Sequence, residues 1–307
     1  MTKPFSQRAF QSSALNVGFP DTFHAVVNSQ KPVAPLKLSL SQLTTLRWDL
    51  VDELSQLKQT GYDAIGLWRP KLVEYGDERA AEMLQRAKVA VSSLSFAGGF
   101  TGGCGFTYVE AIEDGRQAIE QAKTVGARTL IMVTGPQNNH TTRHRDRLVI
   151  DGLRELGQMA ADQQVTLSLL PMQAIFNQRW TYLNSLDQAL EIISKVDHPQ
   201  VRLAFDTYHL GHEPKLLERI PEIAPLTEIV QLSDSDGPPT SHNERLMPGD
   251  GKIPLKNIVQ AFQSAGYADY FDIQVWSSDV WSSNYVHLIE QSHAAVKAMS
   301  VRTVPSF

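Results

Sequence analysis

The sequence has 307 residues, of which 42% are hydrophobic and 20% are charged, and this composition is typical of a globular chain with a substantial core. Its formal net charge of -5 provides no excess of basic residues, which argues against a nucleic-acid partner. No apolar run approaches the roughly 20 residues that a transmembrane helix needs, and the start of the chain lacks a secretory signal. We therefore expect a cytoplasmic protein with no membrane partner.

Residues 1–35 have weak periodicity and several prolines, so we predict an N-terminal arm ahead of a single domain over residues 36–307. The only cysteine, Cys104, excludes an internal disulfide bond. Within its GGCG segment it is either a small loop residue or a nucleophile whose base the sequence does not identify.

From residue 36 onward, short β-favouring runs alternate with longer segments of helical period, which predicts parallel strands joined by crossover helices. Glycine follows three of the expected helices, at Gly61, Gly126 and Gly266, where it makes a good helix stop. The expected helices include residues 49–59, 108–124, 143–162, 182–195 and 255–265. The expected strands are residues 36–40, 63–67, 89–95, 128–133, 165–170, 201–205, 228–232 and 270–276.

Eight β-then-α units of this size predict an α/β protein with a closed (β/α)₈ TIM barrel. An open, doubly wound sheet is the rival fold. It is disfavoured because the segment after the first strand, SLSQLTTLRW, lacks the glycines of a dinucleotide-binding turn.

The carboxyl ends of the strands form the active-site face of such a barrel, and the sixth strand ends there in LAFDTYH. Asp206 ends an apolar run, where a carboxylate is costly unless it is paired, hydrogen-bonded or bound to metal. His209 follows it and has a suitable intrinsic pKa for acid–base work. The alternatives are that Asp206 caps the next turn and that His209 is a core or helix-capping histidine.

The seventh strand contains Gln231 and opens into a long loop rich in proline and glycine, a kind of loop that commonly carries function. Asp234 and Arg245 lie in this loop. An arginine over a barrel mouth suits an anionic or polyhydroxyl ligand because its guanidinium donates several hydrogen bonds in a fixed geometry. A surface salt bridge between Arg245 and Glu244 is the alternative.

Alternation along the eighth strand places Asp272, Gln274 and Trp276 on one side, so we expect Gln274 to point inward. Trp68 and Arg69 end the second strand. An aromatic plate beside hydrogen-bond donors is a common way to hold a sugar, although plain packing explains Trp68 equally well.

Five segments, taken in order over residues 38–275, resemble the xylose isomerase-like TIM barrels, which include sugar-phosphate isomerases, ketose 3-epimerases and inosose dehydratases. The segments are SLSQLTTLRW, DAIGLWRP, LAFDTYH, VQLSDS followed by ERLMPGDGKIPL, and AGYADYFDIQVWS. The resemblance implies a small-molecule sugar or polyol as the ligand. It also implies a homo-oligomer, because barrels of this type are often dimers or tetramers.

In active members of that family, a divalent cation, commonly manganese, is bound by two glutamates, an aspartate and a histidine, and the glutamates also shuttle a proton. The resemblance places Leu170, Asp206, Gln231 and Gln274 at these four positions, and His209 at a substrate-side histidine. Leucine offers no donor and glutamine only a neutral carbonyl, whereas hard divalent ions favour charged oxygen. We therefore expect no metal ligand set beyond Asp206 and no cofactor.

Three functions remain open. The first is a metal-independent enzyme on a sugar or polyol, resembling an isomerase, an epimerase or a lyase. The second is a catalytically inactive carbohydrate-binding protein or partner subunit. The third is a manganese-dependent isomerase or epimerase with rearranged ligands, such as Asp272 or His242. For the first, the candidate catalytic residues are His209, Asp206 and Asp234, and the candidate substrate-binding residues are Trp68, Arg69, Gln231, Arg245 and Gln274.

Overall fold

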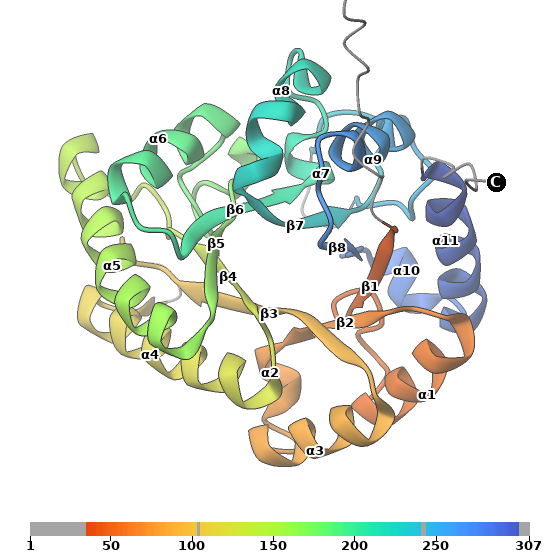
Figure 1. The fold of residues 1–307 in the computed structure, drawn as a ribbon. Helices are drawn as coiled ribbons and strands as arrows, with labels where there is room; N and C mark the ends of the chain where they lie inside the picture. The colour runs from red at the N-terminus through yellow and green to blue at the C-terminus, as the bar shows by residue number, and fades with distance from the viewer. Residues whose placement is uncertain (1–34, 103–104, 241–243, 301–307) are drawn as a thin grey trace, which may run out of the picture. The chain divides into compact units, whose positions relative to one another are not determined.

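A computed structural model of the chain describes residues 35–102, 105–240 and 244–300. Within these ranges eight parallel strands close into a barrel in the order β1 to β8, each hydrogen-bonded to the next and β8 to β1 (Figure 1). The predicted (β/α)₈ barrel is thus confirmed in place of the open sheet. The expected N-terminal arm up to residue 34, Cys104 and His242 lie outside the described residues.

The strands are short and almost wholly buried, as expected when a parallel sheet is covered by side chains on one face and by helices on the other. Their positions match the predicted runs to within a few residues at each end. They are β1 (Lys37–Ser41), β2 (Ala64–Trp68), β3 (Ala90–Gly98), β4 (Thr129–Val133), β5 (Thr166–Leu169), β6 (Val201–Asp206), β7 (Thr227–Leu232) and β8 (Tyr270–Ile273).

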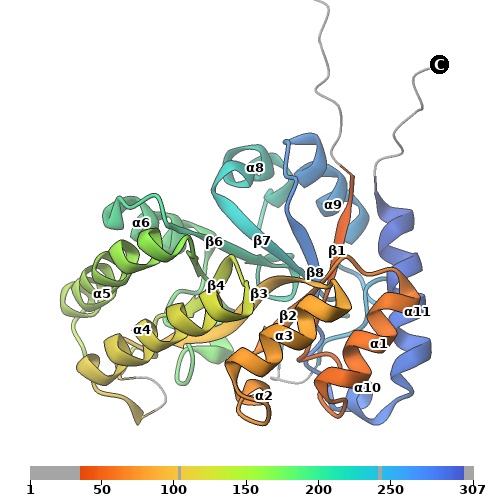
Figure 2. The same cartoon turned by 60° about the horizontal axis from the view of Figure 1, so that its bottom comes forward.

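The helices surround the strands as an outer layer (Figure 2). Thr107 and Glu110 form a capping box at the start of α4, and left-handed Gly61 and Gly126 end α1 and α4 as predicted. The α-helices are α1 (Leu50–Thr60), α2 (Arg69–Leu72), α3 (Asp77–Ala87), α4 (Tyr108–Val125), α5 (Thr142–Gln163), α6 (Leu186–Val196), α7 (Thr207–Leu210), α8 (Leu216–Ile223), α9 (Leu255–Ser264), α10 (Ser278–Ser282) and α11 (Tyr285–Met299), and the 3₁₀ turns are η2 (Ala174–Phe176) and η3 (Ala224–Leu226).

One expected helix begins later than the sequence pattern indicates. Residues 182–195 were expected to be helical, but α6 starts only at Leu186, where the side chain of Ser185 caps it by accepting from the Gln188 amide. The residues before it are not helical, because Thr181 forms a parallel bridge with Gly135 and the Tyr182 amide donates to the Gly135 carbonyl at 3.0 Å. Tertiary pairing therefore overrides the helical propensity of this segment.

The interior of the barrel is divided between an apolar and a polar side. Ile131, Leu170, Ala204 and Ile229 belong to an apolar cluster inside the ring. On the other side the strand register aligns inward-facing polar residues on four adjacent strands, with Asp206 beside Gln231, Gln231 beside Asp272, and Asp272 beside Ser39. In the part of the chain that the structure describes, no helix combines the length and the apolar character needed to cross a bilayer.

Candidate functional site

A cavity of about 280 Å³ opens where β5, β6 and β8 end, at the face of the barrel that carries active sites. We call it the first cavity. Its polar groups come from Arg179, His209, Arg245 and Gln274, and aromatic rings supply much of the remaining wall. The lining residues are Phe96, Leu170, Met172, Phe176, Arg179, Trp180, His209, Arg245, Gln274 and Trp276.

Asp206, the last residue of β6, is fully buried and both of its carboxylate oxygens accept hydrogen bonds. Oδ1 accepts from the Tyr208 backbone N–H at 2.8 Å, and Oδ2 accepts from Arg245 Nη1 at 2.8 Å. Arg245 reaches this position because Asp234 and Leu246 exchange two backbone hydrogen bonds of 2.9 Å each, which fold the loop after β7 back toward the strand ends. The predicted buried aspartate is therefore paired, with a guanidinium as its counter-charge.

The Arg245 guanidinium is held on several sides. Nη1 also donates to Ser233 Oγ at 3.1 Å, and the guanidinium carbon lies 4.5 Å from the centre of the Tyr208 ring. Burial raises the pKa of Tyr208 to about 12, although the charge of Arg245 opposes that rise, so the ring remains a neutral phenol at physiological pH. The alternative of a surface salt bridge from Arg245 to Glu244 is not what the structure shows, since Arg245 is buried against Asp206.

His209 lies in α7, with its ring edge against Phe176 at a centroid distance of 4.9 Å. Its Nε2 is 3.0 Å from Arg245 Nη2, and a guanidinium can only donate, so Nε2 is the acceptor. The same Nε2 is 3.9 Å from Asp206 Oδ2, which is too long for a hydrogen bond. Histidine and aspartate are thus connected through Arg245.

The two glutamines that the resemblance places at ligand positions are hydrogen-bonded to each other. Gln231 Nε2 donates to Gln274 Oε1 at 2.6 Å, and both side chains are buried. Gln231 Oε1 has no hydrogen-bond partner among the described residues. Leu170, which the resemblance also places at a ligand position, lines the first cavity as part of its apolar wall.

These side chains do not fit a divalent ion. The carboxylate of Asp206 already accepts from Tyr208 and Arg245, and the amide oxygen of Gln274 already accepts from Gln231. The described residues contain no group of three or more histidines, cysteines, aspartates or glutamates that could hold a metal. The remaining donor, Gln231 Oε1, is a neutral oxygen, which hard cations bind weakly compared with carboxylate.

Asp272 is a second buried carboxyl group in the barrel, on β8. Neither of its side-chain oxygens meets the geometry of a hydrogen bond with a described residue. Burial raises its pKa to about 7, the Asp206 charge adds to the rise, and the nearby Ser39 hydroxyl offsets only part of it. Asp272 does not line the first cavity.

Asp234, predicted as a candidate catalytic residue, also does not line the first cavity. Its Oδ1 accepts from the backbone N–H groups of Ser235 and Ile253, both at 2.9 Å, and its Oδ2 accepts from that of Gly249 at 3.1 Å. These contacts fix the loop between β7 and α9, the same loop that delivers Arg245.

Trp68 and Arg69 line a separate, second cavity of about 470 Å³. The Arg69 guanidinium donates to both Asp114 oxygens, at 2.9 and 2.8 Å, and to the Phe96 carbonyl at 3.1 Å. Arg69 therefore anchors the end of β3. The first and second cavities share two lining residues, Phe96 and Trp180.

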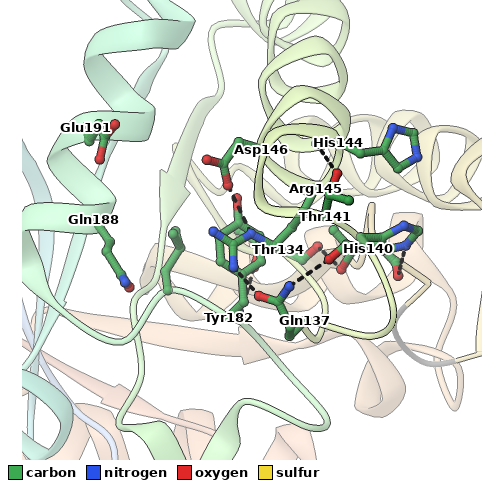
Figure 3. Close-up of polar contacts among 12 residues, drawn as sticks. Thr134, Gln137, His140, Thr141, His144, Arg145, Asp146, Tyr182, Gln188 and Glu191 are labelled. Atoms are coloured by element: carbon green, nitrogen blue, oxygen red, sulfur yellow. Dashed lines mark hydrogen bonds and ion pairs between the residues drawn. The ribbon is translucent and has the colours of Figure 1, made fainter.

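The loop that carries Trp180 is tied to the loop after β4. Gly135 N donates to the Trp180 carbonyl at 2.9 Å, and Tyr182 N donates to the Gly135 carbonyl at 3.0 Å. Arg145 lies over the Tyr182 ring at 3.7 Å, forms an ion pair with Asp146 and donates to Gln137 (Figure 3). Burial, with the Asp146 charge, raises the pKa of Tyr182 above its usual range. These contacts therefore hold the loop that carries Trp180 in place.

Five residues of the first cavity wall were not identified from the sequence: Phe96, Met172, Phe176, Arg179 and Trp180. Phe176, Arg179 and Trp180 lie in the loop after β5, on the same face as the other strand ends, and the aromatic-rich run AIFNQRW was a usable signal. Phe96 sits within β3, where the sequence offered no sign that its side chain separates two cavities.

Comparison with known proteins gives a consistent picture. The family model described as xylose isomerase-like TIM barrel matches residues 54–299. An inosose isomerase of Bacillus velezensis is 22% identical over 278 residues, which cover 86% of this chain and 97% of the relative.

Two solved structures are similar in fold. A protein from Sinorhizobium meliloti superposes with a TM-score of 0.78 at 23% identity, covering 86% of this chain and 98% of that one. The IolI protein, solved with a bound zinc atom, superposes with a TM-score of 0.75 at 20% identity, again covering 86% and 98%. At these identities the likeness establishes the barrel and leaves the chemistry to the residues of this chain.

Proposed function

Because the chain belongs to the xylose isomerase-like TIM barrel family, we propose that its first cavity binds a sugar or polyol without a divalent metal. The observation that carries the proposal is the 2.8 Å contact between Arg245 Nη1 and Asp206 Oδ2. Among the four positions that the resemblance aligns with metal ligands, only Asp206 matches the family's residue. Its counter-charge in this structure is the Arg245 side chain. The guanidinium thus takes the role of the fixed cation in the site.

The walls of the first cavity suit a polyhydroxyl ligand. Trp180 and Trp276 stand edge to face with ring centroids 6.3 Å apart, and such rings pack against the C–H faces of sugars. Arg245 and the amide of Gln274 supply hydrogen-bond groups to hydroxyl or carbonyl oxygens. An inosose isomerase among the relatives is consistent with this class of ligand.

The test is to measure metal content and binding together. Protein purified without chelator is analysed for manganese, zinc and magnesium. A panel of aldoses, ketoses and cyclitols is then titrated into the protein in two buffers, one containing EDTA and the other MnCl₂. We expect well below one equivalent of metal and the same dissociation constants in both buffers. A stoichiometric ion, or binding that depends on manganese, would contradict the proposal and favour rearranged metal ligands.

Arg245→Lys tests the geometry of the binding cation, since lysine keeps the charge but loses the planar fork. We expect at least about tenfold weaker binding of any sugar that binds, as for the loss of a charge-assisted hydrogen bond. Arg179→Lys is the matched control at the exposed edge of the same cavity, and it should change binding less.

A second candidate function is proton exchange at a carbon next to a carbonyl, with His209 as the base. It is favoured by the position of His209 Nε2, which accepts from Arg245 Nη2 at 3.0 Å. A ligand oxygen that takes this donor releases Nε2, which can then accept the proton from carbon. The C–H electron pair becomes the C=C bond of an enolate whose oxygen Arg245 stabilises, and return of the proton to carbon completes the exchange.

Solvent-deuterium exchange into bound ketoses or inososes, followed by NMR, separates this function from a catalytically inactive binder. We expect exchange that His209→Gln abolishes while sugar binding persists, with the exposed His287→Gln as the matched control. Binding without any exchange would instead support an inactive carbohydrate-binding protein.

A further inference from the structure

The second cavity adjoins the first at the pair Phe96 and Trp180, which line both. The two rings lie with centroids 5.7 Å apart and a tilt of 56°, so they form a common wall. A ligand in the first cavity therefore has a neighbouring space of about 470 Å³ into which a substituent can extend. The second cavity is lined by Trp68, Arg69, Pro70, Val73, Phe96, Ala97, Gly98, Gly99, Phe106, Asp114, Gln121, Val133 and Trp180.

The second cavity differs from the first in its chemistry. Its charged pair, Arg69 and Asp114, is internally satisfied by two hydrogen bonds of 2.9 and 2.8 Å, so it makes little demand on a ligand. Most of the remaining wall is apolar side chain or glycine backbone. Val73 and Phe106 at this cavity are 83% and 37% exposed, so apolar side chains of its wall are accessible from solvent.

The occupant that fits is a part of the same ligand. The first cavity, at about 280 Å³, and the second, at about 470 Å³, together fall within the usual range of roughly 300–1,000 Å³ for ligand pockets. Hydrogen-bonding groups for hydroxyls occur at the His209–Arg245 end, and apolar surface occurs beyond Phe96 and Trp180.

We propose that the ligand is a sugar or polyol bearing an apolar substituent, with the polyhydroxyl part in the first cavity and the substituent, an aryl or short alkyl group, in the second. This inference rests on the proposed function, because it assumes that a sugar occupies the first cavity. It narrows the ligand class from free sugars to glycoside-like molecules.

Matched methyl and phenyl glycosides of glucose, galactose, mannose and xylose, titrated by calorimetry against the full chain, test the proposal. We expect the phenyl member of a binding pair to bind about tenfold or more tightly, because burying the ring removes apolar surface from water. The readout is the ratio of the two dissociation constants, which cancels differences in recognition of the sugar itself.

Two variants test whether a preference for phenyl over methyl glycosides arises in the second cavity. Val73→Asp and Phe106→Ser place polar groups at the second cavity and should each reduce the phenyl-to-methyl ratio toward one. Val51→Asp is the matched control, an exposed valine on α1 outside both cavities, and should leave the ratio unchanged.

Failure of the substituent proposal can be distinguished from failure of sugar binding itself. If glycosides bind but the phenyl and methyl members bind equally, or if the ratio is insensitive to both variants, the second cavity does not hold a substituent and the inference is overturned. If no sugar, polyol or glycoside binds at all, the proposed function itself fails. A ratio that falls in both cavity variants and persists in Val51→Asp supports the inference.

Discussion

Asp206 and Asp272 are both completely buried inside the barrel, separated in the register only by Gln231, yet their charges are managed differently. Asp206 has the Arg245 guanidinium and the Tyr208 amide as hydrogen-bond donors. Asp272 has no hydrogen-bonding partner among the described residues, and its pKa rises to about 7. One carboxyl is stabilised by a counter-ion and the other by a proton.

The difference follows from their positions along the strands. Asp206 is the last residue of β6, where a loop residue can reach it, whereas Asp272 lies one residue before the end of β8 and Gln274 follows that end. Gly66 faces Asp272, and its missing side chain leaves room for the carboxyl. A buried carboxyl group in this barrel therefore gains a cationic partner where a loop can reach it.

The largest expected effect comes from removing the counter-ion. Arg245→Met leaves Asp206 buried without a charge partner, and we expect a loss of about 3–5 kcal/mol in the free energy of unfolding at pH 7, measured by urea denaturation. The double variant Arg245→Met with Asp206→Asn should recover most of that loss. A single variant that loses less than about 1 kcal/mol would show that the pair is not a buried ion pair in solution.

The proton on Asp272 predicts a pH dependence. The unfolded carboxyl loses its proton near pH 3.8 and the folded one near pH 7, so between these values rising pH favours the unfolded chain. We expect Asp272 to reduce the free energy of unfolding by about 2–4 kcal/mol between pH 4 and pH 8. Asp272→Asn should therefore gain stability over the wild type at pH 8 and none at pH 4, whereas the exposed Asp279→Asn should follow the wild type throughout.

Filling the space beside Asp272 should have a moderate effect. A methyl group at Gly66 would lie 3.0–3.3 Å from the Asp272 carboxyl atoms, so we expect Gly66→Ala to cost about 1–2 kcal/mol in thermal or urea unfolding. Gly237→Ala is the control, because nothing lies within 4 Å of its added carbon. If Gly66→Ala remains as costly in the Asp272→Ala background, the strain has another source.

The smallest effect on the free energy of unfolding is expected at Ser233, beside the ion pair of Arg245 and Asp206. Ser233→Ala removes an acceptor that lies 3.1 Å from Arg245 Nη1 but leaves the contact with Asp206 in place. We expect a loss of about 0.5–1.5 kcal/mol, the net value of one hydrogen bond, in the same unfolding assay. A loss as large as that of Arg245→Met would mean that Ser233, and not Asp206, holds the guanidinium.

The sequence was sufficient for the barrel because its strands carry their own signals. Runs such as residues 128–133 are apolar and bounded by polar segments, and they match β4 closely. Prediction from the sequence fails where tertiary contacts determine the local structure. Residues 182–185 are not helical, because Thr181 bridges Gly135 and the Tyr182 amide donates to the Gly135 carbonyl.

The site was only partly predictable for the same reason. Strand alternation predicts that Gln274 points inward, and Gln274 lines the first cavity. The contact of Arg245 with Asp206 joins residues 39 positions apart through a long loop, and no periodicity encodes it. Trp68 ends β2 as expected and Arg69 begins α2, but Phe96 and Trp180 separate them from the first cavity, and that wall depends on how the loop with Trp180 folds against β3.

The pairing of Arg245 with Asp206 has a consequence for how the site is supplied with charge. A metal ion must be acquired after synthesis, competes with other ions and can be stripped by chelators. An arginine is part of the polypeptide, so every folded copy carries its cation from translation onward. The price is adaptability, since a tethered guanidinium cannot be exchanged for a different ion or add ligands to its shell.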